Sequence, residues 1–158
     1  MLISFLLLPL LTAIVLLFVK KDTLASSLAI GASLATLMLA VFVSFNKIEA
    51  FDMSWLPSLN SRFTLEVDGL AKILILLTSI SLPAILIATA NNQYKQKNIF
   101  LSLLLFTQAG LMGVFLAGDA LLFYFFWELA LIPVYFLCSQ WGGEKRIAVT
   151  FKFFIYTF

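Results

Sequence analysis

The sequence predicts an all-α fold, a polytopic bundle of transmembrane helices. Apolar residues make up 63% of the chain and charged residues only 11%, against about half and a quarter in soluble domains. The mean hydropathy is +1.08. Five uncharged or nearly uncharged runs are present, and each reaches or exceeds the roughly 18 residues that cross about 30 Å of hydrocarbon.

The helices are expected where charged residues leave long apolar runs. The first run lacks the basic start and the cleavage site of a signal peptide, so we interpret it as a transmembrane helix. We expect one membrane domain, residues 1–158, and a fragment of a longer protein that is truncated in its sixth helix. The predicted spans are residues 2–19, 24–46, 73–94, 98–118, 120–140 and, incomplete, 148–158.

One long connection, residues 47–72, separates the second and third predicted spans. It carries Trp55 and Pro57, and then a stretch in which apolar and polar residues alternate from position 63 to position 68. Alternation with a period of two is typical of a strand. We therefore expect an extended or hairpin segment that lies over the helix bundle.

The basic residues of the loops predict the orientation, because lysine and arginine are enriched on the cytoplasmic side. Six of these residues fall on one side of the predicted bundle and three on the other. The N-terminus is therefore expected outside. The cytoplasmic set is Lys20, Lys21, Lys95, Lys97, Lys145 and Arg146, and the opposing set is Lys47, Arg62 and Lys72.

Composition also limits the partners and cofactors. The net charge is +2 and the basic residues are scattered, which argues against a nucleic-acid surface and leaves the lipid bilayer as the partner that composition predicts. The chain has no histidine and one cysteine, so it cannot by itself assemble a haem, iron–sulfur or zinc site. We interpret Cys138 as a small, buried packing residue.

Glu128 is the only charged residue between positions 120 and 143. A carboxylate at that depth is costly, and such groups usually have a function or a partner. Burial disfavours the ionised form, whereas a nearby lysine favours it, so together they can place proton exchange near neutral pH. We expect Glu128 to handle protons; a purely structural hydrogen bond or ion pair is the alternative.

Other polar groups share the helix face of Glu128. Tyr124, Tyr135 and Ser139 fall with it inside an arc of about 60°, which predicts either a polar pathway or a network that joins helices. Pro133 cannot donate a hydrogen bond to the carbonyl of Leu129. We expect the helix to open or bend there, with a hydrated break or an ordinary membrane-helix proline as the two interpretations.

Lys152 enters the truncated sixth span from its cytoplasmic end. It is expected to serve either as an interfacial anchor, with its side chain extended to the membrane surface, or as a relay partner for a buried glutamate. Asp119 is expected to cap the helix that carries Glu128. In the preceding span, small residues predict close helix packing, and Gln108 could hydrogen-bond across helices or hold water. These small residues are Gly110, Gly113 and Ala117.

The stretch Phe-Tyr-Phe-Phe-Trp-Glu-Leu-Ala-Leu-Ile-Pro-Val-Tyr-Phe-Leu, residues 123–137, carries a family resemblance. With Trp141, the two glycines after it, Arg146 and the Lys-Phe-Phe-Ile-Tyr-Thr string at 152–157, it resembles the subunit M, or chain 4, family of NADH-quinone oxidoreductase. The segment from Trp55 to Leu70 is similar to that family's first long loop. The match covers about the first third of a family member.

The resemblance implies an antiporter-like membrane subunit of respiratory complex I, with fourteen helices in the whole family member and broken helices in inverted repeats. It implies that Glu128 is essential for proton translocation, that its lysine partner lies on a later helix, and that Lys152 has a role in the relay. It also implies that NADH, FMN, iron–sulfur clusters and quinone are held by partner subunits. The implied partners are the other complex I membrane subunits.

Three alternatives remain open. Antiporter-like subunits of multisubunit Na⁺/H⁺ antiporters and of membrane-bound hydrogenases share much of this signature. A non-transporting membrane scaffold is the third. Composition favours a bacterial plasma membrane over a mitochondrial inner or thylakoid membrane.

Overall fold

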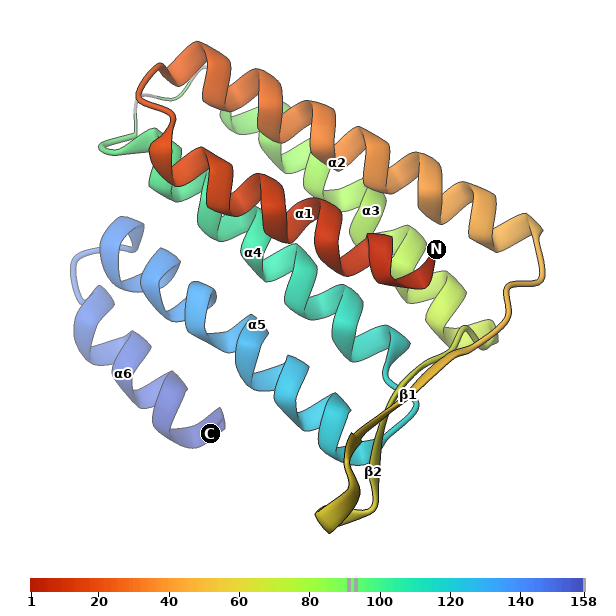
Figure 1. Ribbon diagram of the computed structural model, residues 1–158. Coiled ribbons are helices and arrows are strands. Elements are labelled where there is room, and N and C mark those ends of the chain that lie inside the picture. The colour runs from red at the N-terminus through yellow and green to blue at the C-terminus, as the bar shows by residue number, and fades with distance from the viewer. Residues whose placement is uncertain (91, 93, 158) are drawn as a thin grey trace.

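The computed structural model describes residues 1–158 except 91, 93 and 158, and shows helices that lie alongside one another with a hairpin at one end (Figure 1). The predicted ranges 73–94 and 148–158 therefore lie partly outside the described residues. The helices are α1 (Leu2–Phe18), α2 (Asp22–Phe45), α3 (Gly69–Thr89), α4 (Lys97–Leu116), α5 (Ala120–Trp141) and α6 (Arg146–Thr157). The hairpin strands are β1 (Phe51–Leu56) and β2 (Ser61–Leu65), joined by the 3₁₀ turn η1 (Pro57–Leu59).

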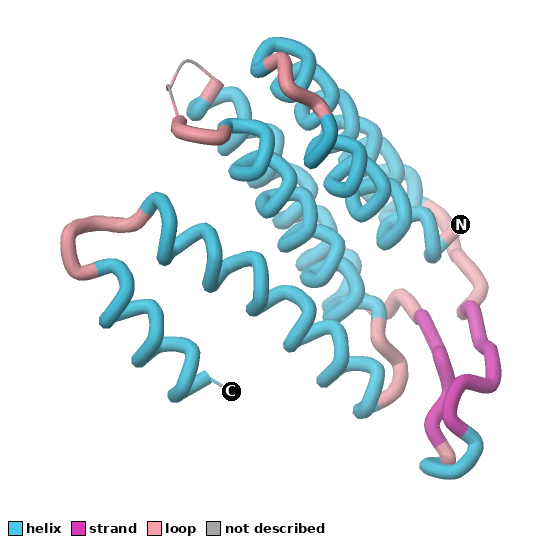
Figure 2. Tube along the Cα trace, turned by 60° about the vertical axis from the view of Figure 1, so that its left-hand side comes forward, coloured by secondary structure: helices cyan, strands magenta, loops and turns pink. Residues whose placement is uncertain are grey.

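Helix α4 is the central element of the bundle. It packs against α1, α2, α3 and α5, whereas α6 packs mainly on α5 at the periphery (Figure 2). In its most apolar 18-residue window 56% of the residues are buried, against 28% in α2 and α5 and 33% in α3. The helix that carries Glu128 is therefore only partly covered by the rest of the described chain.

Four helices are long and apolar enough to cross a bilayer: α2, α3, α4 and α5, among the described residues. Helix α1 is equally apolar in character but has 17 residues. At about 1.5 Å per residue it still measures roughly 25 Å, close to the thickness of the hydrocarbon core. An all-α membrane bundle is thus the observed fold class.

Helix α3 differs most from its predicted range. It begins at Gly69 rather than at residue 73, because the Asp68 side chain accepts a hydrogen bond from the Ala71 amide at 2.6 Å and caps the helix. It ends at Thr89, before the run of polar residues that follows. The predicted span continued past Thr89 because the next few residues carry no charge, although polar uncharged residues also end helices.

The long connection forms a β-hairpin, one of the two forms expected for it. The strands pair antiparallel, with Phe51 opposite Leu65 and Asp52 opposite Thr64. Arg62 donates hydrogen bonds to Asp52 across the pair. The guanidinium of Arg62 and the hydroxyl of Thr64 hold the pKa of the Asp52 carboxyl below its usual value. Rings of Trp55 and Phe63 join the hairpin to the bundle.

Candidate functional site

The hairpin fixes the beginning of α5. Asp119 accepts hydrogen bonds from the amides of Leu121 at 2.9 Å and Leu122 at 3.1 Å, as the sequence predicts for its N-cap. The same carboxylate accepts a hydrogen bond from the Ser61 hydroxyl at 2.9 Å, on strand β2. These bonds, that of Ser61 foremost, hold the pKa of Asp119 below its usual value. Backbone bonds between Gly118 and Thr64 and between Glu66 and Leu116 complete the junction.

One face of α5 packs tightly on α4. A Cβ added to Gly110 would lie 2.7 Å from the Cα of Ala130, and one added to Gly113 would overlap the ring of Phe126. Both glycines are buried, so they set how closely the helices approach. The close packing predicted for Gly110 and Gly113 is confirmed. Ala117 instead lies at the C-cap of α4 and forms a β-bridge with Leu65.

Glu128 lies on the opposite face of α5. On a helix with 100° per residue it is about 140–160° from Phe126, Ala130 and Pro133, the buried residues that face α4. Its side chain is half-buried, and the Oε1 atom is enclosed without a hydrogen-bond partner among the described residues. An enclosed carboxylate oxygen without a donor is a costly arrangement, which is typical of a functional group.

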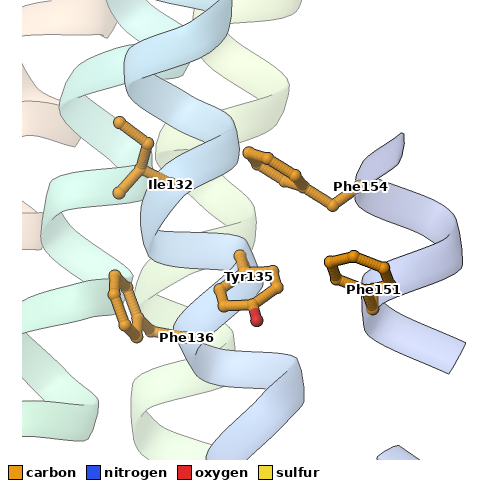
Figure 3. Close-up of a pocket in the computed structure, with 5 residues that line it drawn as sticks. All are labelled: Ile132, Tyr135, Phe136, Phe151 and Phe154. Atoms are coloured by element: carbon orange, nitrogen blue, oxygen red, sulfur yellow. The ribbon is translucent and has the colours of Figure 1, made fainter. Parts of the chain in front are cut away.

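The face that carries Glu128 is the one on which α6 packs. Tyr135 lies about 20° from Glu128 around the helix, and its ring contacts that of Phe154 on α6 with centroids 5.3 Å apart. Figure 3 shows both rings in an aromatic groove between the two helices, with Ile132, Phe136 and Phe151. Glu128 lies about 10 Å further along α5, beyond the described end of α6 at Thr157.

The polar residues predicted to share the helix face of Glu128, namely Tyr124, Tyr135 and Ser139, are only partly brought together. Tyr124, one turn before Glu128, is 52% exposed, and its hydroxyl lies within electrostatic range of the carboxylate. Ser139 donates to the carbonyl of Phe136 at 3.2 Å, inside its own helix. Of these polar residues, Tyr124 is therefore placed to interact with Glu128, whereas Ser139 contacts its own helix.

Lys152 does not meet Glu128. The residue is exposed and lies about 160° around α6 from Phe154, which faces α5. Its side chain therefore projects from the far side of α6. Of the two roles expected for Lys152, this position is the simpler geometry for an interfacial anchor.

Pro133 lies inside α5, which runs from Ala120 to Trp141 without interruption. The proline is buried on the face of α5 that packs on α4. The carbonyl of Leu129 still lacks the backbone donor that position 133 would otherwise provide. An acceptor is thus left one residue after Glu128 in the helix, while the helix itself continues.

The exposure of Cys138 differs from its prediction, and the structure shows which neighbouring helix Gln108 faces. Cys138 is exposed and lines a groove between α5 and α6, so the interpretation as a buried packing residue is wrong. Its position on the face toward α6 leaves it uncovered because α6 is the outermost helix. Gln108 is 2% exposed on α4, and it lines a groove toward α3 rather than toward α5.

Residues at the other end of α5 were missed by sequence reasoning. The indole of Trp141 donates to the carbonyl of Lys95 at 3.2 Å, and its ring contacts Phe100. Lys97, counted as a loop cation, is instead buried in the first turn of α4 and donates to the carbonyl of Ala90. Ser61 was missed as well. These contacts join distant segments, and no local pattern in the sequence signals them.

No group of three or more His, Cys, Asp and Glu side chains that could hold a metal ion occurs among the described residues. What the fold offers instead is a helix bundle with a carboxylate inside an apolar helix. Fold and site together define a multi-pass α-helical membrane protein that carries a carboxylate inside one of its apolar helices.

Comparisons with known proteins specify that class. Residues 117–158 match the family model described as NADH:quinone oxidoreductase/Mrp antiporter, TM. Over 96% of its length the chain is 37% identical to the F(420)H(2) dehydrogenase subunit M of Methanosarcina mazei, covering 32% of that protein. It is 38% identical over 68% of its length to the NADH-quinone oxidoreductase subunit M of Escherichia coli strain K12, covering 22% of it.

A chloroplastic relative is similar too. The chain is 43% identical over 67% of its length to the NAD(P)H-quinone oxidoreductase chain 4 of Chlorokybus atmophyticus, covering 20% of that protein. The chain thus spans a third or less of the length of these relatives. It belongs to the family of antiporter-like membrane subunits that includes subunit M, or chain 4.

Proposed function

We propose that this chain is part of a proton-translocating membrane subunit of an NADH-quinone oxidoreductase. In this role it couples electron transfer in partner subunits to proton movement across the membrane and carries out no redox step itself. The observation that carries the proposal is Glu128. It is a carboxylate inside an apolar helix, with an enclosed and unpartnered oxygen among the described residues, in the segment that matches the family model.

The face of α5 opposite α4 is where protons would be exchanged. Tyr124 lies beside the carboxylate, and Tyr135 borders the groove toward α6. Pro133 frees one carbonyl close to Glu128 in the sequence, which is an acceptor for water. Lys152, on the far side of α6 in this arrangement, acts on Glu128 only after α6 rotates or through further residues. With the N-terminus outside, α5 runs inward from Asp119.

Cofactors and partners are assigned to the rest of the complex in this proposal. NADH, FMN, iron–sulfur clusters and quinone would be bound by other subunits, because the chain has no histidine and a single cysteine. Similar proteins carry names with different electron donors, F(420)H(2), NADH and NAD(P)H. Similarity of the membrane subunit across these names supports a role in ion movement rather than in donor binding.

The decisive experiment replaces Glu128 in the full-length protein within its assembled complex. Glu128→Gln keeps the shape and the hydrogen-bonding capacity of the side chain but removes the titratable proton. We expect proton pumping, measured in vesicles, to fall at least tenfold, and Glu128→Asp to retain part of it. Quinone reduction, assayed in parallel, should fall with pumping if the two are coupled.

A matched control is Glu144→Gln, which removes a carboxylate from the exposed turn between α5 and α6. This variant should pump and reduce quinone as the unaltered protein does. Wild-type rates of both activities in Glu128→Gln would remove Glu128 from the mechanism. Equal losses in both variants would point to a general charge effect instead.

A second candidate function is cation/proton exchange without an oxidoreductase, which the family description supports because it also names Mrp antiporters. It predicts sodium-dependent proton exchange in vesicles that contain no electron-transfer partner. The oxidoreductase proposal predicts pumping only when electrons flow. A full-length protein that exchanges sodium for protons in isolation would therefore favour the antiporter.

A further inference from the structure

A groove between α5 and α6 stays open along the side that carries Cys138. It has a volume of about 360 Å³ and is distinct from the aromatic groove of Figure 3. On α5 it is bordered by Val134 and Cys138, and on α6 by Val149, Thr150 and Phe153. Residues at these spacings share one face of a helix, so the groove runs along both helices between mostly apolar walls.

The groove becomes polar at the end where the turn between α5 and α6 lies. There it is lined by Gly142, Gly143 and Arg146. Arg146 is exposed and makes no ion pair among the described residues, although Glu144 lies two positions away. From Arg146 to Phe153 the helix rises about 10 Å. A cation therefore lies at the mouth of a groove that is apolar further in.

More positive charge lies close to this mouth. The indole of Trp141 donates to the carbonyl of Lys95 at 3.2 Å, so the α3–α4 loop and the α5–α6 turn lie together at one end of the bundle (Figure 1). Lys95 and Lys145 are both exposed. With Arg146 at the start of α6, these two connections bring three cations against one carboxylate, that of Glu144. The mouth of the groove therefore carries a net positive charge.

A phospholipid with an anionic headgroup has the same division between a charged end and an apolar chain. Tryptophan is enriched at the membrane–water interface, which places Trp141 and Arg146 at the depth of the headgroups. Val134 lies about 10 Å from Trp141 along α5, in the hydrocarbon. Guanidinium groups bind phosphate oxygens in a bidentate manner, and basic pockets between transmembrane helices are typical sites for anionic headgroups.

We propose that an anionic phospholipid binds in this groove, with its phosphate at Arg146 and one acyl chain along Cys138 and Val134. Lys95 and Lys145 add electrostatic attraction for the headgroup. The lipid fills the space that α5 and α6 leave open, and it joins the peripheral helix α6 to the bundle. Charge at the mouth and apolar walls further in together select this ligand, and neither feature alone does.

The test uses the full-length protein in its assembled complex, reconstituted into nanodiscs of either phosphatidylglycerol or phosphatidylcholine. With phosphatidylglycerol, which is anionic, we expect a map of the complex to show elongated density in the groove, with its head within hydrogen-bonding distance of Arg146. Phosphatidylcholine has no net charge and should give no ordered head there. Equal density with both lipids, or a protein helix in the groove, would overturn the proposal. This comparison uses the unaltered protein and does not depend on the folding of a variant.

Two variants test the headgroup contact. Arg146→Gln should weaken the binding of phosphatidylglycerol about tenfold, as expected for the loss of a charge-assisted hydrogen bond. The measurement is the amount of phosphatidylglycerol bound per complex over a series of lipid concentrations. Lys20→Gln is the matched control, because it removes an exposed cation from the turn between α1 and α2, and it should bind the lipid as the unaltered protein does. Equal losses in both variants would indicate general charge attraction and overturn the site.

A third variant tests where the acyl chain lies. Cys138→Phe places a larger side chain in the groove and leaves Arg146 unchanged, so it should also lower the amount of bound phosphatidylglycerol. Unchanged binding in Cys138→Phe would refute the placement of the chain. Glu128→Gln should keep the lipid, because Glu128 does not line this groove. The lipid proposal and the proton-translocation proposal can therefore fail independently.

Discussion

Helices α4 and α5 are similar in length, 20 and 22 residues, yet they differ in how much of their surface is buried. Helix α4 is packed on several sides, and 56% of its most apolar window is buried. Helix α5 packs closely on α4 along one face and only on the short, peripheral α6 along the other, and 28% of its window is buried. The central helix supplies small residues at the contact, while the partly covered helix carries the carboxylate. The proposed proton exchange is thus placed on the helix that the rest of the described chain covers less completely.

The difference in burial between α4 and α5 shows how the bundle accommodates a carboxylate inside an apolar helix. Glu128 sits where packing does not enclose it completely, on the α5 face away from α4. A carboxylate on the α4 face would meet Gly110 and Gly113, where there is no room for hydration. One face of α5 can therefore be rigid while the other remains accessible to protons, water or further helices.

The largest expected effect comes from breaking the α4–α5 contact with Gly113→Leu. A side chain at this position would overlap the ring of Phe126, and overpacking of a tight contact costs up to about 3 kcal/mol or more. We expect loss of assembly, measured as the amount of intact complex in membranes. Gly31→Leu is the control, because a Cβ there meets nothing within 4 Å; equal losses in both variants would refute the role of this contact.

A smaller effect is expected at the N-terminus of α5. Since hydrogen bonding lowers the pKa of Asp119 below its value of about 3.9 in unfolded chains, the ionised cap stabilises the folded state above that value. The stabilisation is lost as the pH falls through the lower, folded pKa. Asp119→Asn should therefore flatten the acid limb of a plot of thermal stability against pH. An unchanged limb would contradict this assignment.

The smallest effect is expected for the exposed ion pair of the hairpin. Arg62 and Asp52 are 61% and 42% exposed, and exposed pairs contribute little to stability. Arg62→Gln should leave complex assembly and activity unchanged while raising the pKa of Asp52 toward its usual value, since Arg62 is the main cause of its shift. A clear loss of assembly in Arg62→Gln would contradict the expectation that this exposed ion pair contributes little.

Much of the local structure could be predicted from the sequence. The N-cap role of Asp119 followed from a polar residue before an apolar run, and the structure confirms it. The close contact at Gly110 and Gly113 followed from small residues spaced along one side of a helix, which brings them to one face. Helix α3 ends before its predicted limit at residue 94 because polar, uncharged residues follow Thr89, and the absence of charge alone does not mark the end of a helix.

The interhelical contacts could not be predicted. Ser61 bonds to Asp119 across 58 positions of sequence, and Trp141 bonds to Lys95 across 46. Lys152 was considered as a relay for Glu128 because both are intramembrane charges, but helix rotation places it on the far side of α6. Cys138 was expected to be buried because free cysteines usually are, and the peripheral position of α6 leaves it exposed.

By itself the sequence determined that this protein is a membrane protein, which segments form its apolar helices, and that one of these helices carries an isolated acidic residue. These properties depend on composition and on contacts between near neighbours in the chain. Only the tertiary structure decided which helix is central, which way Glu128 faces, and that Gln108 belongs to the α3 side. These features depend on how each helix is rotated and packed against segments that are distant in the sequence. Several helices determine that packing together, so no local pattern predicts it.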